Sequence, residues 1–409
     1  MRVFVGRGCL QVLLLLLVVV MPSNVGSAGE LLCGIDRLDA SGCRELLGRR
    51  VALVTNVAGV ARSGEADYRV LLRHGVDLRC IMAPEHGFAA RIEAGLAVGN
   101  SVVAGGVPVV SLYGASKKPS LELMSGLDLV VFDLQDVGSR CYTYISTMKM
   151  VMGACRDARV PFMVLDRPNP VAPLGQSGFM VTPGYESFVG AVNVPFVHGM
   201  TIGEIALLLQ QELFPDLEVQ VVTMDGYCRD LFGDELPGFV FRSPSPNIKS
   251  VSTAVVYPAT VFFEAMVVSE GRGTDAPFEQ FGAPFIDAGR LQEAVSGYGL
   301  PGVAFDAVSF VPRSGKFAGE RCFGLRLRVG DRHRFDPFLT SVALLLELQR
   351  LYGGAVGLDV NGRFFDRLAG GPVLRQMVRE LRSSDEIAAA AQSEIKGFRS
   401  RGGGPVLYR

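Results

Sequence analysis

The sequence predicts an α/β protein whose first domain is built on a parallel sheet with helices on both faces. Apolar segments of strand length alternate with segments that can form helices, an order typical of parallel sheets. Polar residues follow each strand segment directly. The chain has 409 residues, whereas a single hydrophobic core stops growing at about 250–300 residues. A second, smaller α/β domain is therefore expected.

The strand candidates of the first domain lie at residues 51–55, 78–83, 107–112, 129–132 and 162–165, and its helix candidates at 65–74, 119–124 and 144–158. The carboxyl ends of parallel strands meet at one edge of a sheet, where ligands bind in folds of this kind. The sequence therefore brings one group of polar residues to this rim: Thr55, Asn56, Glu85, His86, Ser111, Tyr113, Asp133, Gln135, Asp136, Asp166 and Arg167.

A stretch rich in Pro and Gly at residues 168–184 is interpreted as the exit from the first domain, which gives domains of residues 29–184 and 185–409. The second domain is expected to contain strands at 218–224, 252–257, 303–310 and 323–329, and helices at 201–213, 337–351 and 373–381. Thr201 and Glu204 have the spacing of a helix capping box. The glycines at 402–404 predict a mobile C-terminus.

Charge and composition exclude several classes of partner. The chain has 40 Lys and Arg against 41 Asp and Glu, a formal net charge of -1 and no Trp. It has no polybasic run, so neither nucleic acid nor an anionic membrane surface is an expected partner.

The N-terminus has the order of an export signal. Arg2 and Arg7 precede an apolar stretch at residues 10–21, and small residues follow it. The stretch is shorter than the roughly 20 residues of a spanning helix. Residues 1–28 are therefore predicted to be a signal peptide of a periplasmic or extracellular protein, with an uncleaved anchor as the alternative. No stable membrane insertion of the mature chain is expected.

Cysteine usage gives no sign of a disulfide framework or a metal centre. Of eight Cys, Cys9 lies in the signal, which leaves an odd number. There is no Cys-x-x-Cys pair, and the chain has only four His, so neither a metal nor a cofactor is expected. A Cys33–Cys43 disulfide is one expectation for an oxidising compartment, and buried free thiols are expected for most of the others.

Six motifs occur in one order along the chain: Pro84-Glu85-His86-Gly87-Phe88, Phe132-Asp133-Leu134-Gln135-Asp136-Val137-Gly138-Ser139-Arg140, Asp166-Arg167-Pro168-Asn169-Pro170, His198-Gly199-Met200-Thr201-Ile202-Gly203-Glu204, Pro244-Ser245-Pro246-Asn247 and Ser269-Glu270-Gly271-Arg272-Gly273-Thr274. Together they resemble the exo-β-N-acetylmuramidase family. The resemblance implies an exported hydrolase that removes N-acetylmuramic acid from the non-reducing end of peptidoglycan fragments or muropeptides. It also implies a Rossmann-like domain, a smaller C-terminal domain and an active site in the cleft between them.

Hydrolysis of a glycosidic bond takes one carboxylic acid and a second group that stabilises or attacks the oxocarbenium-like centre. Glu85 is the candidate acid, because it falls on the Glu of the family's Glu-His-Gly motif, although it could instead cap a helix. His86 is a candidate to orient it. Asp133 and Asp136 are candidates for the second carboxylate, as are Glu270 and Glu264 if the second domain closes on the rim.

Other residues are candidates for binding the substrate. A guanidinium can bind the lactyl carboxylate of muramic acid, and Arg167 or Arg272 is expected to supply it. Asn247 suits an acetamido or hydroxyl group, although a rigid Pro-x-Pro turn explains its segment as well. Gln135 could position water. Asn56 and Arg140 complete the set, with an ion pair between Arg140 and one of Asp133 and Asp136 as the structural alternative.

Three departures from the family pattern sustain a second hypothesis. Ala265-Met266-Val267 replaces Gly-Thr-Asn, Ala89-Ala90 replaces Arg-Gly, and Tyr227 replaces Trp. If the lost polar groups bind the sugar, the chain would be a glycan-binding protein with slow or no turnover. A dinucleotide-dependent enzyme is disfavoured, because the first strand does not run into Gly-x-Gly-x-x-Gly.

Overall fold

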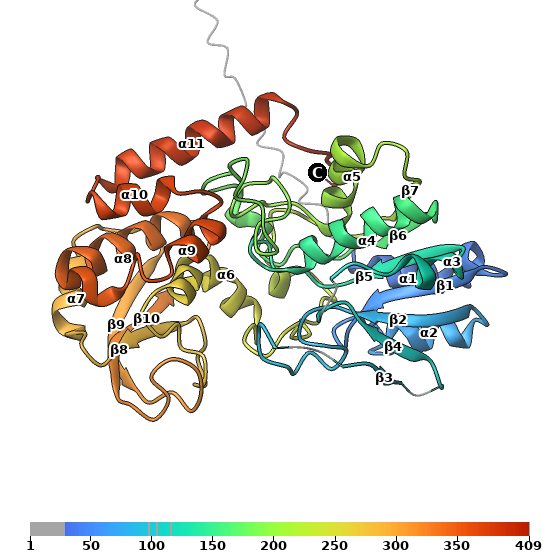
Figure 1. Cartoon of the computed structure of the whole chain (residues 1–409), viewed down its shortest axis with the longest axis horizontal. Coiled ribbons are helices and arrows are strands. Elements are labelled where there is room, and N and C mark those ends of the chain that lie inside the picture. Colours follow the sequence, from blue (N-terminus) through green and yellow to red (C-terminus); the bar gives the residue numbers. More distant parts are fainter. Residues whose placement is uncertain (1–28, 97–98, 104, 115–116, 409) are drawn as a thin grey trace, which may run out of the picture.

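The computed structural model describes residues 29–96, 99–103, 105–114 and 117–408. It has two domains that lie side by side, the first coloured blue to green and the second yellow to red in Figure 1. The expected signal at residues 1–28 lies outside the described residues. Within them, no helix is both long and apolar enough to span a membrane.

The first domain contains a seven-stranded sheet in the order β3-β4-β2-β1-β5-β6-β7, in which only β3 runs antiparallel to its neighbour. Its strands are β1 (Arg50–Thr55), β2 (Asp77–Ala83), β3 (Ser101–Val102), β4 (Pro108–Ser111), β5 (Leu129–Asp133), β6 (Phe162–Leu165) and β7 (Val219–Val222). The predicted α/β fold is confirmed.

Helices cover both faces of this sheet (Figure 1). Alternate residues of β1 point to opposite faces: Val51 and Leu53 belong to one core cluster, and Ala52 and Val54 to the other. Because both faces are buried, the strand is apolar throughout its central part instead of alternating with polar residues. The first cluster is completed by α1 (Gly34–Ala40) and α2 (Asp67–Arg73), and the second by α3 (Leu121–Ser125), α4 (Tyr144–Ala158) and α5 (Ile202–Leu213).

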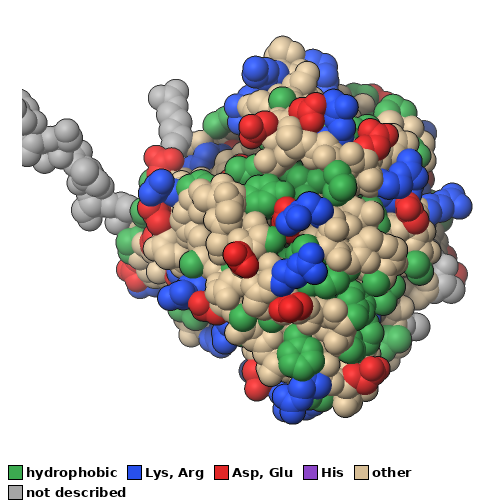
Figure 2. Space-filling view, turned by 90° about the vertical axis from the view of Figure 1, so that its left-hand side faces the viewer, with side chains coloured by type: hydrophobic (Ala, Val, Ile, Leu, Met, Phe, Trp, Pro, Cys, Tyr) green, Lys and Arg blue, Asp and Glu red, His purple; other side chains and the backbone are tan. Residues whose placement is uncertain are grey.

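The second domain has a small antiparallel sheet in the order β8-β10-β9. Its strands are β8 (Gln280–Ala283), β9 (Val303–Phe310) and β10 (Cys322–Val329). Six helices accompany it: α6 (Val251–Thr260), α7 (Ala288–Ser296), α8 (Pro337–Tyr352), α9 (Gly362–Ala369), α10 (Val373–Arg379) and α11 (Ser384–Ser400). Figure 2 shows the outer face of this domain, where basic and acidic side chains are interspersed.

The strand expected at residues 252–257 is wrong, because this segment is helix α6. The Ser250 side chain accepts a hydrogen bond from the backbone N–H of Thr253 and begins the helix. The helix is buried almost all round, so its run of apolar, β-branched residues has the composition of a buried strand. It even tolerates Pro258 close to its end, where a 3₁₀ turn, Val261–Ala265, follows.

The first sheet continues beyond residue 184, where the first domain was expected to end. Strand β7 pairs with β6, and α5 packs on the same sheet. The Thr201–Glu204 capping box of α5 is confirmed. Thr201 also donates a hydrogen bond from its hydroxyl to Asp166, at 2.8 Å.

The C-terminus is docked on the first domain, so the predicted mobile C-terminus is wrong for residues 404–408. The Tyr408 hydroxyl donates to Oδ2 of Asp166 at 2.6 Å and accepts from the backbone N–H of Met224 at 3.0 Å. The backbone N–H of Leu407 donates to Glu204 at 2.9 Å. The glycines therefore turn the chain back onto the sheet.

The cysteines of the described residues are free thiols, so the Cys33–Cys43 disulfide is wrong. All but Cys228 are buried. Burial raises the pKa of Cys43 to about 11 and that of Cys80 to about 11. These thiols stay protonated and serve as small apolar groups of the core.

Candidate active site

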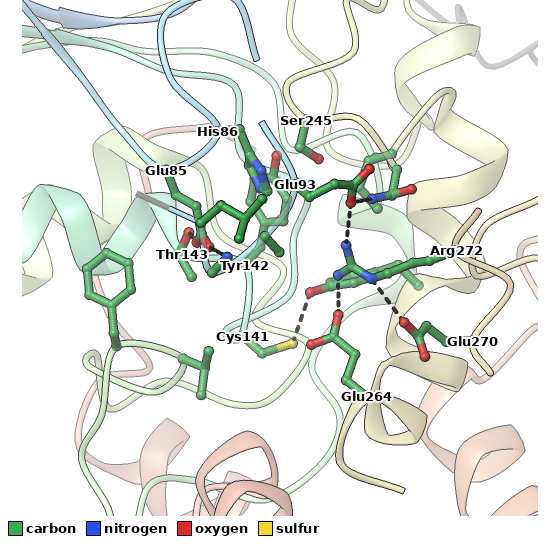
Figure 3. A pocket seen from close by; sticks show the side chains of 18 of the residues that line it. Glu85, His86, Glu93, Cys141, Tyr142, Thr143, Ser245, Glu264, Glu270 and Arg272 are labelled. Atoms are coloured by element: carbon green, nitrogen blue, oxygen red, sulfur yellow. Dashed lines mark hydrogen bonds and ion pairs between the residues drawn. The ribbon is translucent and has the colours of Figure 1, made fainter. Parts of the chain in front are cut away.

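A cavity of about 630 Å³ lies between the two domains. Figure 3 shows Glu85, His86 and Thr143 on one side of it and Glu264, Glu270 and Arg272 on the other. The first three come from segments that follow β2 and β5 of the large sheet, and the last three from the start of the second domain. Each wall thus supplies carboxylates to one shared space.

Glu85 lies two residues beyond the end of β2 and is only 5% exposed. Both of its oxygens are held by uncharged donors. The backbone N–H of Gly95 donates to Oε1 at 3.0 Å, and the Thr143 hydroxyl donates to Oε2 at 2.7 Å. Burial and the neighbouring Glu85 carboxylate raise the pKa of Tyr113, which therefore stays protonated. The acid is fixed in position without being paired to a cation.

His86 holds the loop that carries Glu85. Its Nδ1 lies 2.7 Å from the carbonyl oxygen of Ile92. A carbonyl only accepts, so Nδ1 carries the hydrogen and Nε2 has the free lone pair. Burial lowers the pKa of His86, which keeps the ring neutral. Its φ of +70° is an uncommon conformation for a residue with a side chain.

The opposite wall is a network of charged groups. Arg272 Nε lies 3.1 Å from Glu270 Oε1, Lys316 Nζ lies 3.1 Å from Glu270 Oε2, and Arg272 also pairs with Glu264. Burial lowers the pKa of Arg272, but the two carboxylates outweigh this effect and raise it overall. Burial raises the pKa of Glu264.

The loop around Arg272 requires glycine before it. Gly271 has a φ of +81°, and a Cβ there would lie 2.6 Å from the carbonyl oxygen of Gln280. The close approach fixes the backbone of Arg272 against β8. The guanidinium also lies over the ring of Phe278, with 5.0 Å from its carbon to the ring centroid.

Asn247 and Glu93 connect the two walls. The Asn247 amide donates to Oε2 of Glu93 at 3.2 Å, and the same oxygen lies 3.9 Å from Arg272. Figure 3 shows the approach of Glu93 to Arg272. Glu93 belongs to the loop after β2, whereas Asn247 precedes α6. The Asn247–Glu93–Arg272 contacts therefore span the cleft next to Glu85.

Asp133 and Arg167, two other predicted site residues, lie outside the lining of the cavity. They form a buried bidentate ion pair with exposures of 0% and 4%. Arg167 also donates to the carbonyl of Val60 at 3.1 Å. These partners hold the guanidinium through Nε and Nη2, so the structure gives the pair a framework position beneath the rim.

Asp136, Gln135, Arg140 and Asn56 are likewise absent from the cavity lining. Asp136 accepts from the backbone N–H of Gly138 at 2.7 Å, and the Gln135 amide donates to the Asp136 carbonyl at 2.8 Å. The Asn56 amide donates to the Tyr144 hydroxyl at 2.8 Å. These side chains stabilise the rim loops.

The suggested ion pair of Arg140 with Asp133 or Asp136 is wrong. The Arg140 guanidinium is completely buried and donates to three backbone carbonyls, those of Phe179, Val194 and Leu368. Asp136 has the imidazole of His198 as its neighbour instead, with 3.2 Å between Oδ2 and Nε2.

The sequence analysis missed several residues that line the cavity: Glu93, Lys117, Thr143, Phe188, Lys316 and Arg367. The sequence did contain an indication for Thr143, because this residue lies between the polar rim segment and the predicted helix at 144–158. Lys117 and Lys316 lie in loops without a periodic pattern, and Arg367 lies on α9, a helix that the sequence analysis did not predict.

The departures from the family pattern lie away from the cavity. Ala265 and Met266 are buried, at 2% and 3% exposure, and Val267 donates its backbone N–H to the Val356 carbonyl. Tyr227 packs against Tyr408, with 5.0 Å between the ring centroids. Neither these residues nor Ala89-Ala90 line the cavity.

Carboxylates on facing walls of a cleft are the arrangement that glycoside hydrolases use, and this is the class that the fold and the site indicate. Among the described residues, no group of three or more His, Cys, Asp or Glu is placed to hold a metal ion. Models of the N-terminal and C-terminal parts of exo-β-N-acetylmuramidase NamZ match residues 51–252 and 255–408. The chain belongs to this family of glycosidases, and the resemblance in its six motifs is confirmed.

Similar proteins agree with this assignment. The chain is 40% identical over 368 residues to the peptidoglycan β-N-acetylmuramidase NamZ of Bacillus subtilis, a match that covers 89% of this chain and 88% of the relative. Two solved structures of DUF1343 family proteins from Bacteroides fragilis are similar, with TM-scores of 0.84 and 0.74. Each is 28% identical and covers 93% of this chain and 99% of its own.

Proposed function

We propose that this protein is an exported glycoside hydrolase that removes N-acetylmuramic acid from the non-reducing end of peptidoglycan fragments, with Glu85 as general acid. The observation that carries the proposal is the position of Glu85. It is a nearly buried carboxyl group at the wall of a sugar-sized cavity, held by Thr143 and Gly95 and faced by the carboxylates of the second domain.

In this mechanism Glu85 protonates the glycosidic oxygen as the bond to the leaving sugar breaks. Glu270 is proposed as the second carboxylate, which stabilises the positive charge on the sugar ring. Arg272 and Lys316 hold it through one oxygen each, so its orientation is fixed before the substrate binds. Neutral His86 keeps the Glu85 loop in place, and Asn247 is proposed to bind a polar substituent of the sugar.

The second candidate function is a glycan-binding protein without turnover. Its basis was the loss of polar residues at 265–267, but these residues pack away from the cavity. Of the carboxylates expected for hydrolysis, Glu85, Glu264 and Glu270 line the cavity. The enzyme is therefore the better supported function.

Two isomeric disaccharides test the reaction and its direction. We expect the purified protein to release free N-acetylmuramic acid from N-acetylmuramyl-β-1,4-N-acetylglucosamine and to leave N-acetylglucosaminyl-β-1,4-N-acetylmuramic acid intact, as followed by mass spectrometry. Cleavage of both isomers would contradict exo action at muramic acid. Binding of the first isomer without any release would favour the glycan-binding function.

Export is proposed from Arg2, Arg7 and the apolar stretch at residues 10–21. We expect the protein to be recovered outside the cytoplasm with its N-terminus near residue 29, as determined by N-terminal peptide mass spectrometry after cell fractionation. An intact Met1 in the membrane fraction would indicate a retained anchor, and an intact Met1 in the cytoplasm would contradict export.

A further inference from the structure

Two cations of the cavity have no carboxylate partner within the part of the chain that the structure describes. The described lining contains the carboxylates Glu85, Glu93, Glu264 and Glu270 and the cations Lys117, Arg272, Lys316 and Arg367. Glu264 and Glu270 pair with Arg272 and Lys316. Lys117 and Arg367 make no ion pair with a carboxylate of the described residues. The cavity therefore presents two cations to whatever enters it.

Lys117 is held in place by aromatic rings. Its Nζ lies 3.9 Å from the ring centroid of Phe188 and 4.6 Å from that of Tyr113, and the two rings are 5.7 Å apart. Cation–π contacts of this kind orient an ammonium group but leave its charge without a counterion. Because Tyr113 adjoins Glu85, the ammonium group lies in the same part of the cavity as the acid.

Arg367 approaches the same region from the second domain. It lies on α9, and its backbone carbonyl would be 3.2 Å from a Cβ placed on Gly190. Gly190 is two residues from Phe188, so the loop that supports Lys117 also contacts the helix that carries Arg367. A cation from each domain thus lies beside one loop.

We propose that Lys117, with Arg367 as a second cation, binds the lactyl carboxylate of the N-acetylmuramic acid residue. This inference rests on the proposed function and adds the origin of its sugar specificity. N-acetylglucosamine lacks the lactyl group and would leave the two cations without a counterion. Of the arginines expected from the sequence for this role, Arg167 pairs with Asp133 and does not line the cavity, and Arg272 lies between two carboxylates.

The experiment compares the muramyl disaccharide with its lactyl methyl ester, which has no charge and differs in shape only by one added methyl group. Lys117→Met retains the apolar stem and removes the charge. We expect it to lower kcat/KM for the acid about 10- to 100-fold, as for loss of a charged hydrogen bond, and to leave the slower hydrolysis of the ester unchanged. Lys117→Arg should recover most of the activity, and Arg367→Met should show a similar dependence on substrate charge.

Lys118→Met is the matched control. Lys118 is the next residue but pairs with Asp157 on α4 and does not line the cavity. We expect it to behave as wild type on both substrates. An equal loss by Lys117→Met on the acid and the ester would overturn the proposal, because it would mean that Lys117 only supports the fold.

Calorimetric titration with free N-acetylmuramic acid and N-acetylglucosamine separates this inference from the proposed function. Tight binding of the muramic acid alone, lost in Lys117→Met, supports the carboxylate site even if the wild type hydrolyses nothing. Hydrolysis by the wild type without any dependence on Lys117 overturns the carboxylate site and leaves the proposed function standing.

Discussion

Glu85→Gln should lower kcat for release of N-acetylmuramic acid from the disaccharide by about 100- to 10,000-fold, the usual contribution of a general acid. The amide has nearly the shape of the carboxyl group and still accepts a hydrogen bond from Thr143, but it has no proton to give to the leaving oxygen. Steady-state kinetics on protein with an unchanged circular dichroism spectrum measures the effect. Glu122→Gln, an exposed residue on α3, is the matched control.

Substrates with different leaving groups distinguish a general-acid role of Glu85 from its other possible roles. A 4-nitrophenyl β-glycoside of N-acetylmuramic acid releases an acidic phenol that leaves without protonation. Glu85→Gln should therefore lose much less activity on this substrate than on the disaccharide. An equal loss on both substrates would contradict the role of acid and would favour one in which Glu85 contacts the sugar ring.

Asp133→Asn should lower the free energy of unfolding by about 3–5 kcal/mol, because it leaves the Arg167 guanidinium buried without its counterion. Urea denaturation followed by circular dichroism measures the change. Asp128→Asn is the matched control. Asp128 directly precedes β5 and pairs with Arg50, but this pair is exposed to solvent. We expect little change in stability there, because water screens exposed pairs.

Activity per folded molecule separates the framework role of Asp133 from a catalytic one. At a temperature where Asp133→Asn remains folded, we expect kcat to stay close to that of wild type. A stable Asp133→Asn protein with kcat lowered a thousandfold would indicate that Asp133, and not Glu270, is the second catalytic carboxylate.

The first domain could be predicted closely, because its strands and helices follow from local patterns. The helix at 144–158 has the observed bounds, and the five strand candidates coincide with or overlap observed strands. The second domain was harder to predict. A buried helix such as α6 has the same apolar, β-branched composition as a buried strand, and only its length and its Ser250 cap distinguish the two.

The candidate site could be predicted only in part. Glu85, His86, Asn247, Glu264, Glu270 and Arg272 do line one cavity. Asp133 ends β5 and Asp136 lies three residues beyond it, but they bind a guanidinium and the backbone beneath the rim. A carboxylate after a strand can either face the cleft or hold the loops that form it, and sequence spacing is the same in both cases.

Lys117 and Lys316 show a second reason why the sequence alone could not predict the whole site. Each lies in a segment without helical or strand periodicity, and each meets its partners only through the tertiary fold. Lys316 contacts Glu270, 46 residues away, and Lys117 contacts Phe188, 71 residues away. No local pattern in the sequence indicates contacts between residues that are this far apart along the chain.

The docking of Tyr408 bears on how the two domains can move. The chain enters the second domain near α6 and returns to the first domain after α11, where Tyr408 binds Asp166 and Met224. The second domain is thus connected to the first at both of its ends, as an inserted domain would be. Two connections restrict it to a hinge-like opening of the cleft and exclude free rotation about a single linker. Removing the last few residues would convert a double attachment into a single one, although none of them touches the cavity.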